Sequence, residues 1–166
     1  HRLFGEKGNR TLFDAATLGN VSEVRKLLKE GTVPDAYTNE GGWTAIMRAC
    51  GEGHLEVVEM LMHNGADVDT QDQWGNTALM VASSHGHDSV VHALLKGRAH
   101  IDIQNTFGST ALMLSSLGAH TQVVRTLLAH KANIRLQNSD GKTALEQAQR
   151  ETLTKGEASR EEKKPA

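Results

Sequence analysis

The sequence predicts an all-α solenoid in which helix-turn-helix units stack side by side and β-hairpin-like turns join them. Three observations support this prediction. The motif Gly-x-Thr-Ala begins at four positions, each 33 residues after the last: Gly42, Gly75, Gly108 and Gly141. Two short apolar segments follow in the first three copies, and a polar stretch rich in Gly, Asn and Asp leads to the next copy. A fixed period of about 20 to 50 residues is typical of repeat architectures, so each period is interpreted as one structural unit.

The first element of each unit is a short helix. In the copy that starts at residue 75, residues 77–84 are long enough for about two turns and carry apolar side chains at helical spacing, namely Ala78, Leu79, Val81 and Ala82. The Gly-His pair at Gly86 and His87 ends this segment. The pattern therefore predicts a two-turn helix followed by a sharp break.

The second element is a helix over residues 89–96 in the same copy. It is apolar around more than half of its circumference, through Val90, Val91, Ala93, Leu94 and Leu95. Such a helix must be covered on more than one side. Isolated helices this short are marginal in water, so their stability must come from stacking on neighbouring units.

The third element is an extended turn that links one unit to the next. GRAHIDIQNTFG and NGADVDTQDQWG have the composition of such turns. A less regular copy begins near Arg10, where LFDAATLGN parallels IMRACGEGH at a spacing of 34. We place the extra residue in the NEGGW loop, where Gly41 and Gly42 stand in the place of Gly75 alone.

In motif, period and apolar positions the chain resembles the ankyrin repeat family, whose 33-residue unit contains Thr-Pro-Leu-His-x-Ala. The resemblance covers roughly residues 10 to 151 and implies an ankyrin repeat solenoid. This chain has TAIM, TALM, TALM and TALE where the family usually has TPLH. Met47, Met80 and Met113 thus replace the family's His, and we expect them to pack as flexible apolar side chains.

We expect an ankyrin repeat domain over residues 10–151, with repeats at about 10–41, 42–74, 75–107 and 108–140. Residues 141–151 form a half-repeat, because the following stretch has no apolar face for a second helix. An N-terminal extension covers residues 1–9, and the charged composition of residues 152–166 favours a flexible tail. If nothing else covers that end, the helix that carries Leu127 and Leu128 would be under-buried.

Composition narrows the classes of function. The chain has 18 basic and 20 acidic residues and a formal net charge of -2, so it offers no electrostatic footprint for nucleic acid or an anionic membrane. No apolar run approaches the ~18 residues needed to span a bilayer. Cys50 is the only cysteine, which favours a reducing compartment. We therefore predict a cytoplasmic or nuclear location, with no nucleic-acid partner and no membrane insertion.

Recurring histidines do not predict a metal site. His54, His87 and His120 occupy the family's Gly-His position, and the resemblance implies that each ring hydrogen-bonds backbone across the turn between the two helices of its unit. Ligands one repeat apart lie about 10 Å from each other by helix-packing distance. That is too far to share a zinc ion at about 2 Å per bond. We predict no metal site and no cofactor.

Serines and the cysteine do not predict catalysis. Ser83 and Ser84 lie in no Gly-x-Ser-x-Gly elbow. Ser83 and Cys50 fall where the family has a small buried Ala, so we expect both to pack in the core. A phosphate-binding loop, a dinucleotide fingerprint and a paired-carboxylate cleft are all missing from the sequence. We predict that the chain is not an enzyme and has no catalytic residues.

Aromatic residues in or beside the turns are candidates for binding: Tyr37, Trp43, Trp74 and Phe107. The resemblance implies that turn tips and first helices line one concave face, where exposed rings with a polar surround would be suited to anchor a partner. Alternatively each ring closes a gap between units. Both interpretations stay open for Trp43, and binding is favoured for Trp74 and Phe107.

The resemblance also implies partner contacts beside the turns and at the ends of first helices: Glu40, Glu52, Gln73, Asn76, Ser84, His85, Thr106, Ser109, Leu117, Asp140, Lys142 and Arg150. Glu40 and Glu52 at one end, with Lys142 and Arg150 at the other, would match a partner with a basic and an acidic end. We predict a non-catalytic scaffold that binds a protein or peptide on the concave face. The alternatives are a regulatory or substrate-recruiting segment of a larger enzyme, channel or effector, and a small-ligand-binding module.

Overall fold

The computed structural model describes residues 11–149, and all the regular structure within that range is helical. The helices are α2 (Val21–Lys29), α3 (Ala45–Glu52), α4 (Leu55–His63), α5 (Ala78–Ser84), α6 (Asp88–Lys96), α7 (Ala111–Leu117) and α8 (Thr121–Ala129). Residues 11–17 and 144–149 are also helical. The predicted all-α class is confirmed. The predicted extension at 1–9 and tail at 152–166 lie outside the described residues.

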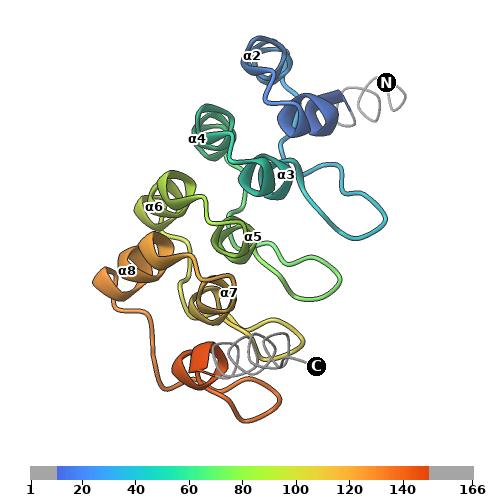
Figure 1. Cartoon of the computed structure of the whole chain (residues 1–166). Coiled ribbons are helices and arrows are strands. Elements are labelled where there is room, and N and C mark those ends of the chain that lie inside the picture. Colours follow the sequence, from blue (N-terminus) through green and yellow to red (C-terminus); the bar gives the residue numbers. More distant parts are fainter. Residues whose placement is uncertain (1–10, 150–166) are drawn as a thin grey trace, which may run out of the picture.

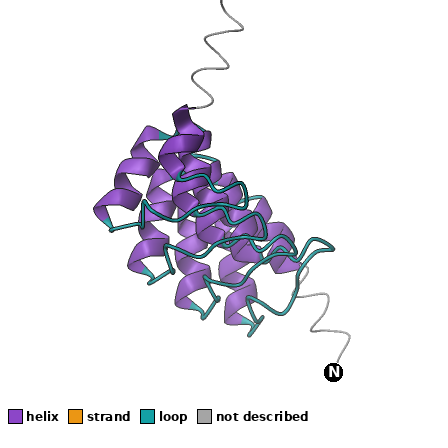
Figure 2. Cartoon of the chain, turned by 90° about the horizontal axis from the view of Figure 1, so that it is seen from below, coloured by secondary structure: helices purple, strands orange, loops and turns teal. Residues whose placement is uncertain are grey.

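Two parallel layers of helices build the solenoid (Figure 1). In the first layer α3 packs on α5 and α5 on α7, while in the second layer α2, α4, α6 and α8 follow one another. The loops project from the first layer, on the side away from the second layer (Figure 1). Viewed from below, they run beside one another along the stack (Figure 2). We call the surface formed by the loops and the adjoining side of the first layer the inner face.

The core is continuous along the stack because each repeat contributes the same positions to it. Leu61, Leu94 and Leu127 from successive second helices are all completely buried. Met47, Met80 and Met113 are buried as well, at 0 to 1 % exposure, which confirms their predicted apolar packing. The neighbouring repeat thus supplies the cover that the apolar pattern of each helix requires.

The threonine of each motif starts the first helix. The hydroxyls of Thr44, Thr77 and Thr110 accept a hydrogen bond from the backbone N–H three residues later, at 3.4, 3.3 and 3.3 Å. This N-cap satisfies one of the donors that a helix start leaves unpaired. In the last repeat Glu146 also accepts from the N–H of Thr143 at 2.8 Å, which completes a capping box. The cap explains why Thr recurs at this position.

The recurring histidines connect neighbouring repeats. The ring nitrogens Nε2 of His54, His87 and His120 hydrogen-bond to backbone carbonyls of the preceding repeat, those of Thr17, Gly51 and Ser84, at 3.1, 2.9 and 2.9 Å. The expected hydrogen bond from each ring to backbone is therefore present, and the carbonyl that accepts it belongs to the preceding repeat. The ring extends to the end of the preceding first helix because the units stack closely enough for it to reach there.

Candidate functional site

Each loop tip is held by one side chain that binds the backbone twice. In the loop before α5, Asp72 Oδ1 accepts hydrogen bonds from the N–H groups of Trp74 and Asn76, at 2.9 and 2.8 Å. Asn105 binds Phe107 and Ser109 in the same way, at 3.0 and 2.9 Å. Such Asx-type turns fix the backbone locally. Trp74 and Phe107, which follow Asp72 and Asn105 by two positions, therefore lie at tips with a defined backbone.

Neighbouring tips are also bonded to each other. The N–H of Gln73 donates to the carbonyl of Gly41 at 3.0 Å, that of Thr106 to Trp74 at 2.9 Å, and that of Ser139 to Phe107 at 2.9 Å. Inside a tip, the N–H of Asp72 donates to the carbonyl of Asn76 at 3.0 Å. These contacts resemble hairpin pairing, although no residue between 11 and 149 is assigned to a strand. The loops therefore form one connected, preorganised edge.

Two of the four predicted aromatic residues are exposed at this edge. The Trp74 side chain is 44 % exposed and that of Phe107 is 60 % exposed. The two residues occupy equivalent tips, 33 positions apart. Their backbone is fixed by the turns and by the bonds between tips, so the exposure belongs to an ordered element. These two rings are thus accessible apolar groups at the loop tips, while Val33 and Ile134 are exposed elsewhere in their loops.

The other two aromatic residues pack inside the repeats. Tyr37 is half-buried and contacts Phe13 edge to face, with ring centroids 5.3 Å apart. Trp43 is half-buried against the core, and the Arg48 guanidinium carbon lies 5.0 Å from the centroid of its ring. For Trp43 the structure favours the gap-closing interpretation that the sequence left open.

The remaining predicted contact residues divide by accessibility. Glu40, Glu52, Gln73, His85, Thr106, Leu117 and Asp140 are exposed, while Ser84 and Lys142 are half-buried. Ser109 is only 8 % exposed, so little of its side chain is accessible to a partner. The Asn76 amide is occupied by Asp72 and Asn105, with bonds of 3.1 and 2.8 Å. Arg150 lies outside the described residues.

Arg48 is the residue of this face that sequence reasoning missed. It lies on α3 at the position that carries Val81 in α5 and Leu114 in α7. Arg48 was not recognised because the equivalent residues in the next two repeats are apolar, which is typical of a core position. The signal in the sequence is weak, because the equivalent positions carry Asp14, Val81, Leu114 and Gln147, and only two of these four residues are apolar.

Side chains that resembled catalytic groups lie in the core. Ser83 and Cys50 are fully buried, as predicted. Burial raises the pKa of the Cys50 thiol well above its usual range, which opposes formation of a reactive thiolate. Within residues 11–149 no group of three or more His, Cys, Asp or Glu side chains could hold a metal ion. In the same range no helix is long and apolar enough to cross a membrane.

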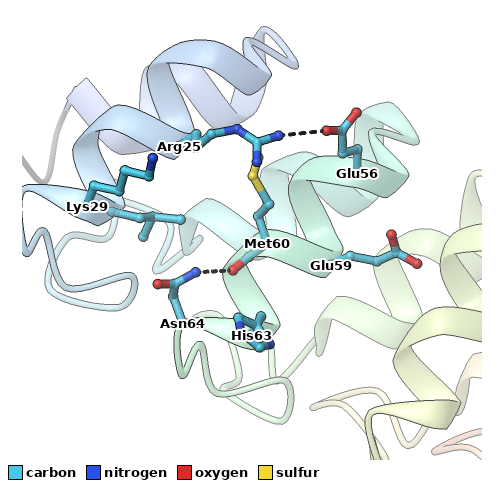
Figure 3. Close-up of a pocket in the computed structure, with 8 residues that line it drawn as sticks. Arg25, Lys29, Glu56, Glu59, Met60, His63 and Asn64 are labelled. Atoms are coloured by element: carbon cyan, nitrogen blue, oxygen red, sulfur yellow. Dashed lines mark hydrogen bonds and ion pairs between the residues drawn. The ribbon is translucent and has the colours of Figure 1, made fainter.

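A polar hollow of about 540 Å³ lies between α2 and α4 in the second helix layer (Figure 3). Arg25 and Glu56 form an ion pair of 3.1 Å at one end of it, and the Asn64 amide donates to the carbonyl of Met60 at 2.8 Å at the other. The paired side chains are more than half exposed. Exposed ion pairs of this kind contribute little to stability. The charge of Arg25 is nevertheless already paired with the carboxylate of Glu56.

A second hollow, of about 470 Å³, is apolar and lies at the C-terminal end of the described stack. It is lined by residues of α7, of α8 and of the helix at 144–149, including Leu112, Leu128 and Leu145. Leu127 is buried, whereas Leu128 is 45 % exposed. The expected incomplete cover of this end therefore applies to Leu128 and not to Leu127.

Comparison with known proteins agrees with this architecture. The family model for ankyrin repeats in three copies matches residues 12–105 and 79–155. "Ankyrin repeat domain-containing protein 40" of Mus musculus and of Homo sapiens is 39% identical over 56 residues, which is 34% of this chain and 15% of that protein. "Ankyrin repeat and SAM domain-containing protein 6" of Danio rerio is 36% identical over 67 residues, 40% of this chain and 9% of that protein. The chain thus corresponds to a small part of these relatives, and it belongs to the ankyrin repeat family.

Proposed function

We propose that the chain is a non-catalytic scaffold that binds a segment of another protein on the inner face, with Trp74 and Phe107 as the apolar anchors. One observation carries the proposal: two equivalent loop tips present exposed aromatic rings, while their backbone is held by Asx turns and by bonds between tips. Because the backbone of the tips is already fixed, little conformational entropy of the loops is lost on binding. Aromatic side chains are also enriched among the residues that dominate binding energy.

The surrounding surface supports a protein segment as the ligand. Gln73, Thr106 and Asp140 are exposed beside the two rings and supply a polar rim. The formal net charge of -2 favours a protein partner over nucleic acid, and the single buried cysteine fits a cytoplasmic or nuclear location.

The test compares the double variant Trp74→Ala and Phe107→Ala with the wild type in affinity capture and in thermal unfolding. We expect loss of the captured partner with little change in melting temperature, because neither ring belongs to the buried core: Phe107 is 60 % exposed and Trp74 is 44 % exposed. Ile134→Ala is the control for loss of an exposed apolar side chain, since Ile134 is 61 % exposed and lines the hollow at the C-terminal end of the described stack. Unchanged capture by the double variant would refute the anchors, and a large fall in melting temperature would assign the rings to packing.

A second candidate is that the chain recruits substrates or regulators for a larger protein. It is supported by the length of the relatives, of which the chain covers 15% or less. The inner face would act in the same way in this case. The two candidates differ only in whether a catalytic or channel domain is joined to the repeats, and the full-length open reading frame distinguishes them.

A further inference from the structure

We propose that Arg48 is an anion-binding point on the inner face and that it receives one carboxylate from an Asp or Glu side chain of the partner segment. This inference rests on the proposed function. It adds a chemical requirement for the partner that the family relationship does not supply.

The guanidinium group of Arg48 is held between two aromatic rings. Its central carbon lies 5.0 Å from the ring centroid of Trp43 and 5.6 Å from that of Phe13. Both distances fall within the ~6 Å range of cation–π contacts. Tyr37 supports the arrangement through its edge contact with Phe13. An arginine fixed in this way has lost most of its freedom before a ligand arrives, and its planar fork keeps one orientation.

The charge of Arg48 has no anion within the described part of the chain. No carboxylate of residues 11–149 pairs with it, and its Nε is buried without a hydrogen-bond partner. Arg25, on the other layer, is instead bonded to Glu56. Arginine stays protonated in proteins, and native structures rarely leave buried donors unpaired. The remaining donors of the half-buried side chain suit a carboxylate, which the guanidinium fork can bind through two oxygens.

This anion-binding point is continuous with the exposed aromatic edge. A Cβ placed on Gly41 would lie 3.6 Å from both the Trp43 and the Trp74 rings, so the two indoles meet at this glycine. The Trp43 ring also reaches Gly51, 3.7 Å from where a Cβ would stand. A partner segment lying against Trp74 can therefore extend across Trp43 toward Arg48.

Charge decides which anion fits. Glu40 and Glu52 are exposed near the same end of the inner face. They would repel a strongly acidic segment, and more so a phosphate with about two negative charges. A single carboxylate, accompanied by neutral or basic residues, meets the requirement of Arg48 with less of this repulsion.

The experiment selects peptides from a random phage-displayed library on the wild-type chain and on the Trp74→Ala and Phe107→Ala double variant. We expect peptides enriched on the wild type to carry one Asp or Glu at a fixed spacing from an apolar residue. A synthetic copy of an enriched peptide is then compared with its Asn or Gln counterpart by fluorescence polarisation. The amide should bind the wild type about tenfold or more weakly, as expected for loss of a charged hydrogen bond.

Variants of the protein complete a double-mutant cycle. Arg48→Met should weaken binding of the acidic peptide by a similar factor and make the amide replacement silent. Arg48→Lys keeps the charge without the planar fork, so it should recover only part of the affinity. Arg25→Met, an arginine of the other layer, should bind as the wild type does. The amide comparison uses the unmodified protein, so it remains decisive even if Arg48→Met lowers the melting temperature.

Two outcomes overturn the inference and are distinguishable. If peptides are enriched in a manner that depends on Trp74 and Phe107, but an acidic residue is not required, the proposed function stands and Arg48 is a packing residue. If no peptide is enriched on the wild type over the double variant, the proposed function fails and the inference fails with it.

Discussion

At the scale of single residues, the same sequence positions serve different purposes in different repeats. Position 48 carries an arginine between two rings, whereas the equivalent position is Asp14 in the preceding repeat and the apolar Val81 and Leu114 in the next two. Gly53 provides a second example, because a Cβ there would stand 2.7 Å from the His87 ring of the next repeat. The corresponding residue after α7 is Ala119, which has a Cβ. This agrees with the sequence of the next copy, where the position equivalent to His87 and His120 is Leu153 and not a histidine. A residue is thus explained by its neighbour in the stack as much as by its own repeat.

One residue pair predicts a pH dependence. Asp69 accepts hydrogen bonds from the backbone N–H of His100, at 2.9 Å, and from its ring Nδ1. The side-chain bond and the charge of Asp69 raise the pKa of His100 above 6.5. Because the folded pKa is the higher one, the contribution to stability is complete below about pH 6.5. It is lost as the pH rises through the folded pKa.

NMR titration of the His100 ring checks this prediction. Asp69→Asn should move the pKa of His100 back toward its ordinary value and flatten this part of the stability profile. Asp35→Asn is the control, since Asp35 accepts from the N–H of Asp67 at the equivalent place in an earlier loop. A pKa of His100 that does not respond to Asp69→Asn would contradict the assigned cause.

At the scale of elements, the loops are stabilised by their contact with one another. Each Gly-x-Thr-Ala motif begins with a glycine of positive φ, from 70° at Gly108 to 78° at Gly42. Left-handed backbone is unfavourable for other residues, which accounts for part of the requirement. The rest of the requirement for glycine comes from the neighbouring loop, whose backbone passes close to the glycine. A Cβ on Gly108 would lie 2.8 Å from the backbone nitrogen of Ser139.

Replacing two glycines separates these causes. Gly141 has a φ of 71°, and nothing lies within 4 Å of a Cβ built on it. Gly108→Ala and Gly141→Ala both introduce alanine into left-handed backbone, at about 1 kcal/mol or more each. Only Gly108→Ala also pushes two loops apart. We expect it to lower the free energy of unfolding by at least about 1 kcal/mol more than Gly141→Ala, as measured by urea denaturation. Equal losses would show that contact between loops does not contribute.

At the scale of the whole molecule, stability is the sum of repeats and of the interfaces between them. The described helices have seven to nine residues where their bounds are defined, too few to be stable alone. The buried row of Leu61, Leu94 and Leu127 joins the second helices into one core. A change in a central repeat therefore affects the contacts on both of its sides.

Leu94→Ala tests this continuity. Leu94 is completely buried in α6, between α4 and α8. Truncation of such a leucine removes apolar contacts and leaves a cavity, so we expect a loss of about 2 to 5 kcal/mol in the free energy of unfolding. Leu18→Ala, at a side chain that is 77 % exposed, should change it by no more than about 0.5 kcal/mol. Denaturant unfolding of both variants measures the difference, and similar small losses would contradict the proposed core.

The repeat, its period and the pattern of buried side chains can all be predicted from the sequence. These properties follow from local rules, since threonine caps, left-handed glycines and apolar spacing act the same way in every copy. It also favoured Trp74 and Phe107 among the turn aromatics, and these two are exposed at equivalent loop tips, while their role in binding is a proposal.

The accessibility of the remaining candidate residues depends on contacts in the folded stack. Ser109 is buried, Asn76 is occupied by its neighbours, and Trp43 packs over Gly51 and Arg48. The histidines bond to the repeat before their own. Several of these outcomes depend on contacts between residues that are far apart in sequence: 36 positions separate His87 from Gly51, and 29 separate Asn76 from Asn105. Such contacts follow from the stacking of whole units, which no single repeat encodes.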